Sequence, residues 1–311
     1  GLATALVNSG HIAEPGTGVF AASSPNRQRT DTISLEIIES GVDILFSGGE
    51  ELLIPRGVVG YHGFEGIREE SLHLMDRARE LAYRIIYTRE ELLALPSHTR
   101  KVLGVFAPYH TFLDETEEYL AQEELPLYEP MSPTIAEMTE VALRLLEARG
   151  DRFLLVVEEE GSDNFANSNN ATGALTALSR ADDALGVALD FVERNPETLL
   201  ITAADSDAGG MEVFPLRNAP PGVENMILPA QTRNGAPLDG IEGTRGHPFM
   251  SKPDRFGKRW PFGIAWASFD DNLGGIVARA HGLNAGLLPT SVDNTDIYRM
   301  MYATLFGVWL P

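Results

Sequence analysis

A doubly wound α/β fold, with a mostly parallel sheet flanked by helices, is the architecture that the sequence pattern indicates. Short apolar runs alternate with amphipathic helical stretches from residue 2 to about residue 215, an alternation typical of βαβ units. The 311 residues are 43% hydrophobic and 22% charged, a composition that argues against intrinsic disorder. We therefore expect a single α/β domain with one irregular insertion at 215–259, where Pro, Gly and Asn are frequent.

The expected strands of this part are six apolar runs, at residues 2–8, 42–46, 83–87, 101–107, 153–158 and 198–204. The clearest helix is 134–149, in which apolar residues recur every three or four positions, Thr134 and Glu137 form a capping box, and Gly150 ends the pattern. The same spacing predicts a helix over 175–192. Beyond the insertion we expect strands at 262–269 and 275–280 and a helix at 296–308 capped by Asp293.

Composition excludes several classes of function. The chain has 24 Lys and Arg against 45 Asp and Glu, a formal charge of −21, which opposes binding to nucleic acid. No apolar run approaches the roughly 20 residues of a membrane-spanning helix. There is no cysteine, so any metal ion must be held by oxygen or imidazole ligands.

Acidic side chains gather where three expected strands end. Glu158, Glu159 and Glu160 lead to Asp163; Asp205 follows the next strand; and a third group comes later, Asp270-Asp271-Asn272. In a doubly wound sheet, ligands bind at the carboxyl ends of the strands. One such group alone is more often a turn or a helix cap. Three groups at one edge would repel each other, so we expect a divalent cation between them.

At these residues the chain resembles the alkaline phosphatase family. Glu158, Asp163 and Asn167 have the spacing of the family's Glu, Asp and His metal-binding stretch, and 202–206 is similar to its Thr-Ala-Asp-His strand end. Residues 38–49 resemble the family's strand that ends in three glycines, and 293–298 give a fourth match in the same order. The resemblance covers nearly the whole chain.

The resemblance implies a metal-dependent phosphate monoester hydrolase, in which two ions bridge the phosphate and a magnesium-type site lies nearby. Glu158 matches the magnesium ligand, while Asp163 and Asp205 match ligands of the two catalytic ions. Asn167 and Ser206 stand where the family has His, and the last family His falls at Asp271, with Asp270 and Asn272 as alternatives. The expected metal-binding residues are thus Glu158, Asp163, Asn167, Asp205, Ser206, Asp270 and Asp271. Oxygen ligands favour Mg or Ca, with Zn as the alternative.

The same resemblance implies that part of the enzyme precedes this sequence. In the family, a metal-bridging Asp and the nucleophilic Ser come before the region that residues 2–8 match. No segment here supplies that Ser, so the nucleophile is unknown and we expect the 311-residue chain alone to be inactive or nearly so. The family's early Thr ligand of the magnesium site should fall near 14–17, where the local sequence does not reproduce it.

Other expectations stay open at this point. A phosphodiesterase or a sulfatase of the same superfamily is an alternative, as is a catalytically silent divalent-metal-binding structural domain. The resemblance implies a small phosphate ester as substrate, a homodimer, and a periplasmic or secreted location. His11 and His281 follow strands and are candidates to face the site, although a histidine at a strand end more often has a structural hydrogen-bonding role.

Overall fold

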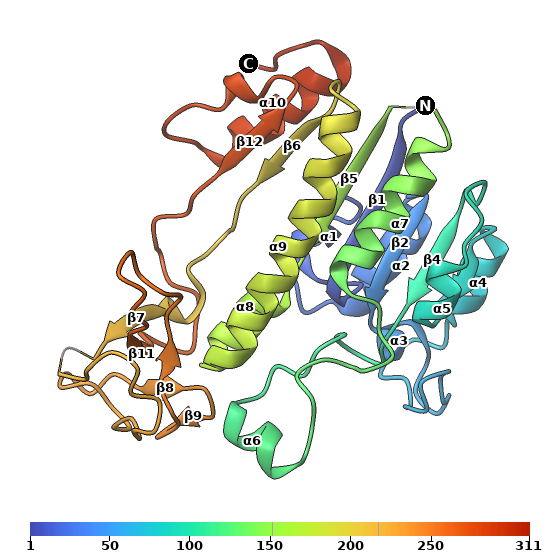
Figure 1. Ribbon diagram of the computed structural model, residues 1–311. Coiled ribbons are helices and arrows are strands. Elements are labelled where there is room, and N and C mark those ends of the chain that lie inside the picture. The colour runs from blue at the N-terminus through green and yellow to red at the C-terminus, as the bar shows by residue number, and fades with distance from the viewer. Residues whose placement is uncertain (151, 217) are drawn as a thin grey trace.

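A five-stranded parallel sheet forms the centre of the molecule in the computed structural model, which describes residues 1–150, 152–216 and 218–311 (Figure 1). Its spatial order is β3-β4-β2-β1-β5, and the strands are β1 (Ala3–His11), β2 (Ile44–Gly48), β3 (Arg84–Ile86), β4 (Val102–Val105) and β5 (Phe153–Glu158). Each falls on a predicted apolar run. The predicted α/β class is therefore confirmed.

Helices cover both faces of this sheet, as a doubly wound fold requires. Alternate strand residues point to opposite faces, so Val7 packs in a core beneath α7 (Ile135–Glu147). Its neighbour Leu6 packs in a second core, beneath α2 (Thr30–Glu39) and α4 (Leu74–Glu80). The three inner strands, β1, β2 and β4, are apolar on both faces because helices cover both.

The two predicted helices are present. The capping box of Thr134 and Glu137 begins α7, as expected. The second helix, α9 (Ala171–Arg194), is longer than its periodic stretch and lies beside α7 (Figure 1). Asn170 caps it by accepting a hydrogen bond from the amide N of Gly173 at 2.6 Å. The cap thus starts α9 four residues before the first residue of the apolar pattern that predicted the helix.

The sixth predicted strand lies outside the central sheet, which corrects the sequence-based expectation. β6 (Leu199–Thr202) pairs antiparallel with β12 (Arg279–Gly282) in a sheet of two strands. β12 begins at Arg279, so the predicted strand at 275–280 is placed too early. β5 is the last strand of the central sheet, and its outer edge has no strand partner within the described ranges.

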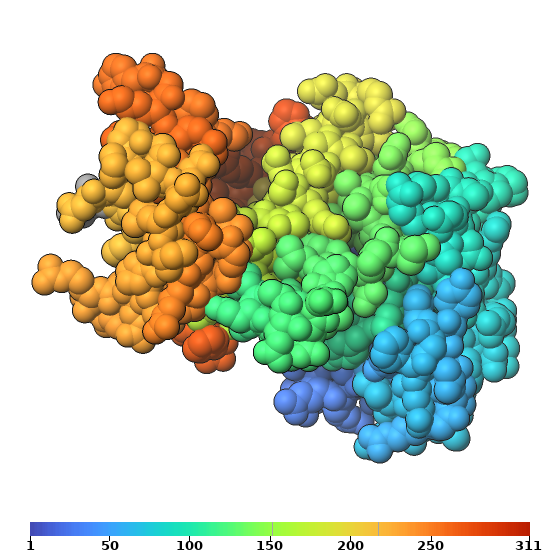
Figure 2. Space-filling model, turned by 60° about the horizontal axis from the view of Figure 1, so that its bottom comes forward, coloured from blue at the N-terminus to red at the C-terminus, as the bar shows by residue number. Residues whose placement is uncertain are grey.

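A small antiparallel sheet is built from the segment predicted as irregular, 215–259, and from the strands that flank it. It contains β7 (Glu212–Pro215), β8 (Leu238–Gly240), β9 (Gly243–Thr244), β10 (Phe249–Met250) and β11 (Pro261–Ala265). Figure 2 shows these orange residues as a lobe beside the body of the molecule. The strands of two to five residues are too short to show periodicity, which explains why the sequence did not predict most of them.

The closing helix is α10 (Asn294–Phe306), capped by Asp293 as predicted. The remaining helical segments are short: α1 (Pro15–Gly18), α3 (Glu50–Leu53), α5 (Arg89–Leu93), α6 (Glu117–Gln122), α8 (Gly161–Asn167), η1 (Ala208–Gly210) and η2 (Ala285–Leu287). Among the described residues, no helix combines the length and the apolar character needed to cross a bilayer.

Candidate metal centre

The neighbouring carboxyl ends of β1 and β5 place the first group of polar side chains. The two strands pair in register with Asn8 opposite Glu158, and the chain then turns from β1 into α1. The amide N of the Asn8 side chain donates to Thr17 Oγ1 at 3.0 Å and to the Glu158 carboxylate. Strand pairing thereby brings residues 150 positions apart into one site.

Two glycines allow three glutamates to converge there. A Cβ atom on Gly16 would lie 1.6 Å from Glu158 Oε1, so this carboxylate occupies the space that a side chain at position 16 would need. A Cβ atom on Gly10 would lie 2.9 Å from the Cγ atoms of both Glu14 and Glu160. Glu14, Glu158 and Glu160, which we call the glutamate cluster, therefore pack against the end of β1.

Glu159 belongs to a different environment from its two neighbours. Its Oε1 atom accepts hydrogen bonds from Ser9 Oγ at 2.9 Å and Tyr128 Oη at 3.2 Å. Burial raises its pKa to about 7. The Oε1 atom of Glu159 thus accepts hydrogen bonds from two hydroxyl groups, and Glu159 does not belong to the glutamate cluster.

Two members of the glutamate cluster, Glu158 and Glu160, have raised pKa values, whereas His11 keeps the pKa of Glu14 below its usual value despite burial. Burial, followed by the charges of Glu14 and Asp205, raises the pKa of Glu158 to about 7. Burial and the charges of Glu14 and Glu158 raise the pKa of Glu160 to about 10. No Lys or Arg forms an ion pair with Glu158 or Glu160 in the part of the chain that the structure describes. A divalent cation with oxygen ligands fits this donor set, because it would compensate the buried charge.

A second group of acidic residues surrounds the end of α8. The side-chain N of Asn167 donates to Asp163 Oδ2 at 3.1 Å and to Asp271 Oδ1 at 3.0 Å. Ser206 Oγ lies 3.5 Å from Asp163 Oδ1. Burial, together with the charges of Asp271 and Asp205, raises the pKa of Asp163 to about 6. Four of the predicted residues are thus in contact, and Asp205 is close enough to influence both groups electrostatically.

The geometry gives Asn167 a donor role. Its Oδ1 atom accepts a hydrogen bond from the backbone N of Gly209 at 3.0 Å, so its NH2 group must face the two aspartates. In this orientation Asn167 positions the carboxylates, and its oxygen does not face a cation between them. Asp271, and not the alternative Asp270, makes the contact; the interactions described for Asp270 involve its backbone.

Arg27 is a cation at the edge of the glutamate cluster. Its Nη2 atom lies 3.5 Å from Glu14 Oε2, and its side chain is 70% exposed. Asp271 has a lowered pKa, mainly because Asn167 donates a hydrogen bond to it, and the charge of Arg27 contributes. An exposed guanidinium beside a cation site is suited to bind the oxygens of an anionic group.

Several of these residues escaped the sequence analysis. Glu14, Arg27 and His110 lie in segments that only the folded chain brings to the site. Of the three, only Glu14 has a sequence feature that points to the site, which is its position just after an expected strand. His11 lies beside Glu14, with Nε2 2.9 Å from Glu14 Oε1. His281 is exposed on β12, opposite Leu200.

Fold and site together define an α/β protein with a group of carboxylates at the carboxyl ends of a parallel sheet. The sequence profile described as "Alkaline phosphatase" matches residues 17–228. The chain belongs to the alkaline phosphatase family, which confirms the resemblance.

Curated relatives agree with this assignment. Alkaline phosphatase H of Pseudomonas aeruginosa (strain UCBPP-PA14) is 26% identical over 236 residues, which are 70% of this chain and 47% of the relative. Streptomycin-6-phosphate phosphatase of Streptomyces griseus is 31% identical over 190 residues, which are 56% of this chain and 40% of the relative. The chain thus spans less than half the length of these two relatives.

Solved structures show the same fold. The alkaline phosphatase of Thermus thermophilus superposes with a TM-score of 0.69 at 22% identity, covering 99% of this chain and 71% of that chain. The enzyme of the Antarctic bacterium TAB5 gives a TM-score of 0.69 at 16% identity, covering 98% of this chain and 72% of that chain. At these identities the likeness establishes the fold alone.

Proposed function

We propose that this chain carries the cation-binding part of a metal-dependent phosphate monoester hydrolase. The observation that carries the proposal is the convergence of Glu14, Glu158 and Glu160 on Gly10 and Gly16 at the end of β1. Burial and neighbouring charges raise the pKa values of Glu158 and Glu160, and neither has a Lys or Arg partner among the described residues. Membership of the family supports it, and so does a solved structure of a histidine-to-aspartate mutant of the TAB5 enzyme, which holds Mg in its M3 site.

The chain's own residues have separate roles in this proposal. Glu158, Glu160 and Glu14 hold one divalent cation, and Asp163, Asp205 and Asp271 hold the second. Asn167 donates to two of these carboxylates and orients them, and Ser206 supplies a hydroxyl group beside Asp163. When bound, the cations would offset the charge of the phosphoryl oxygens. Oxygen ligands favour Mg or Ca over Zn at both positions.

We place Arg27 opposite the phosphoryl group. Its exposed guanidinium contacts Glu14 weakly, at 3.5 Å, so it is free to turn toward an anion that enters beside the cations. The nucleophile comes, in this proposal, from a segment outside these 311 residues. Among the described residues no strand pairs with the outer edge of β5, which supports this: Glu158 ends that strand, and a further strand paired there would reach the site.

A silent metal-binding domain is the second candidate. Asp163 and Asp271 are already satisfied in part by the amide of Asn167, which lowers the need for a cation there. A phosphodiesterase or sulfatase uses the same frame and differs in the ester it takes. We also propose, from the family, a small phosphate ester as substrate, a homodimer, and a periplasmic or secreted location.

Phosphate binding by the 311-residue chain separates these candidates. With saturating Mg²⁺, calorimetric titration with inorganic phosphate should show binding that falls about tenfold in Arg27→Ala, because a charge-assisted contact contributes on the order of 1.5 kcal/mol. Arg29→Ala removes an exposed arginine two positions away and should change nothing. Competition with sulfate and with a phosphate diester then ranks the ester classes.

A second experiment, on hydrolysis, tests whether the nucleophile lies outside these 311 residues. The chain alone should give no burst of nitrophenol from p-nitrophenyl phosphate, since it lacks the covalent step. A stoichiometric burst would refute the external nucleophile. Absence of phosphate binding in the presence of bound Mg²⁺ would favour the silent domain.

A further inference from the structure

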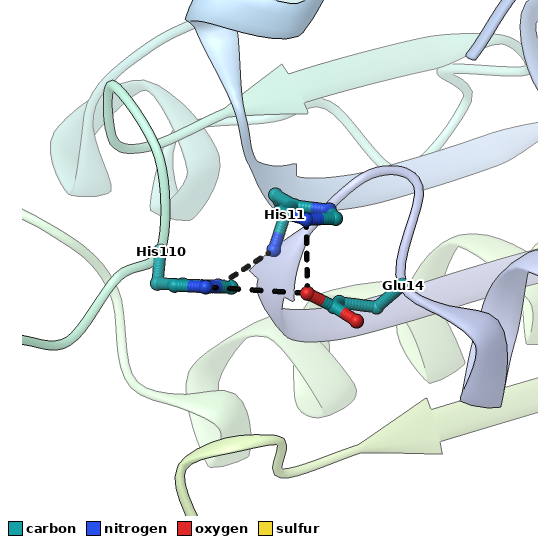
Figure 3. A group of neighbouring side chains, drawn as sticks. All are labelled: His11, Glu14 and His110. Atoms are coloured by element: carbon teal, nitrogen blue, oxygen red, sulfur yellow. Dashed lines mark hydrogen bonds and ion pairs between the residues drawn. The ribbon is translucent and has the colours of Figure 1, made fainter. Parts of the chain in front are cut away.

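His11, Glu14 and His110 form a buried group beside the proposed cation site (Figure 3). Their relative exposures are 6%, 4% and 7%. Glu14 Oε1 lies 2.9 Å from His11 Nε2 and 4.0 Å from His110 Nε2. One ligand-type atom from each residue falls within 4.8 Å of the others, so spacing alone would allow a metal ion bound by the two imidazoles.

Packing fixes the two rings. They stack with centroids 5.0 Å apart and an interplanar angle of 12°, and the His110 ring stacks in turn on Phe112 at 4.8 Å. The loop that carries His110 is tied to β1, because Thr111 donates to the backbone O of Ser9 from its N atom at 2.9 Å and from Oγ1 at 2.7 Å. The rings therefore have little freedom to reorient around an ion.

The Nδ1 atoms of both rings are used as acceptors. The backbone N of Ala13 donates to His11 Nδ1 at 3.2 Å, and the backbone N of His11 donates to His110 Nδ1 at 3.2 Å. A neutral imidazole has one N–H and one acceptor nitrogen, so in each ring the proton is on Nε2, the atom on the Glu14 side. A metal-binding histidine has the opposite arrangement, with its second nitrogen donating a hydrogen.

We propose that His11 and His110 are positioning residues for Glu14 and that neither binds metal. The N–H of His11 Nε2 holds Glu14 Oε1, and His110 stacks on the His11 ring and fixes its plane. The second carboxylate oxygen, Glu14 Oε2, is left on the side of Arg27. The proposal rests on the proposed function, which places a cation at that cluster. Groups that orient a ligand typically change metal affinity by 10- to 100-fold when removed.

Two substitutions separate positioning from ligation. His11→Gln keeps an N–H donor near the Nε2 position, whereas His11→Leu removes the donor. Mn²⁺ titration of the 311-residue chain, followed by electron paramagnetic resonance, should give His11→Gln an affinity near that of wild type and His11→Leu an affinity about tenfold weaker, with the number of sites unchanged. His281→Leu, which alters an exposed histidine on β12, is the matched control.

Loss of one Mn²⁺ site in both variants would mean that His11 is a ligand and would overturn the proposal. A His11→Leu chain that binds Mn²⁺ as tightly as wild type would also overturn it.

Nitrogen-15 NMR of the metal-free wild-type chain is a second test, which does not depend on the folding of a variant. Both rings should be protonated at Nε2 and stay so when Mg²⁺ is added. A ring protonated at Nδ1 would contradict the proposal. If the wild-type chain binds no Mn²⁺, the proposed cation site is wrong. In that case the NMR spectra still test the proposed hydrogen bonds of the two histidines.

Discussion

Glu117 is a buried acid away from the metal centre, on the first turn of α6. It is 8% exposed, and its Oε1 atom accepts a hydrogen bond from the backbone N of Thr172 at 3.0 Å. Its Oε2 atom is buried and has no partner among the described residues. Burial, with the charges of Asp239 and Glu118 adding to it, raises its pKa to about 8. The folded state therefore favours the protonated acid at neutral pH.

The Glu117→Gln chain should be more stable than wild type at alkaline pH. Because the folded pKa, about 8, exceeds the reference value of 4.5, the stability contributed by the protonated acid is complete below pH 4.5 and is lost as the pH rises through 8. We expect the variant to gain roughly 1–3 kcal/mol at pH 8 and nearly nothing at acidic pH. Urea unfolding at both pH values measures this, with the exposed Glu115→Gln as control. A gain that does not depend on pH would contradict it.

At the scale of elements, the turn from β1 into α1 organises the site. α1 has Pro15 at its start, a residue whose fixed φ suits a first helical turn, and the following Gly16 lets the Glu158 carboxylate pack directly on the backbone. The sequence predicted β1 and β5 from their apolar runs. It did not predict this turn, because four helical residues carry no periodicity and the close approach depends on Glu158, which ends a strand far along the chain.

The Gly16→Ala substitution tests this close approach. Its Cβ atom would lie 1.6 Å from Glu158 Oε1, so the carboxylate must move, and we expect Mn²⁺ affinity to fall about tenfold or more. Gly186→Ala is the matched control, since a Cβ atom there meets nothing within 4 Å on α9. The control should raise the free energy of unfolding by about 0.5–1 kcal/mol and leave Mn²⁺ affinity unchanged. If the Gly16→Ala chain binds Mn²⁺ as tightly as wild type, the close contact between Gly16 and Glu158 is not needed for the cation site.

At the scale of the whole molecule, the apolar runs of the sequence predicted the strands of the central sheet. Which strands pair with each other became known only from the structure. Five of six predicted strands in the first two thirds of the chain join the parallel sheet, and β2 and β4 in its interior are fully buried. β6 has the same pattern and pairs with β12, since an apolar run does not specify its neighbour. The structure brings Asp163, Asn167 and Asp271 into contact, and their role as metal ligands stays a prediction. Glu14, His110 and Arg27 carry no motif spacing.

Metal content after equilibration is the most direct test of an oxygen-rich cation site. The chain would be dialysed against millimolar Mg²⁺ and Ca²⁺ with micromolar Mn²⁺ and Zn²⁺, washed, and analysed by mass spectrometry of its metals. We expect Mg or Ca at both proposed positions. Combining Glu158→Gln with Glu160→Gln should remove the ion of the glutamate cluster and leave the second ion, whereas Asp182→Asn with Asp183→Asn, which removes the same two charges from the exposed side of α9, should leave both ions bound. Stoichiometric Zn, or a metal content that the paired glutamate substitutions leave unchanged, would contradict the account.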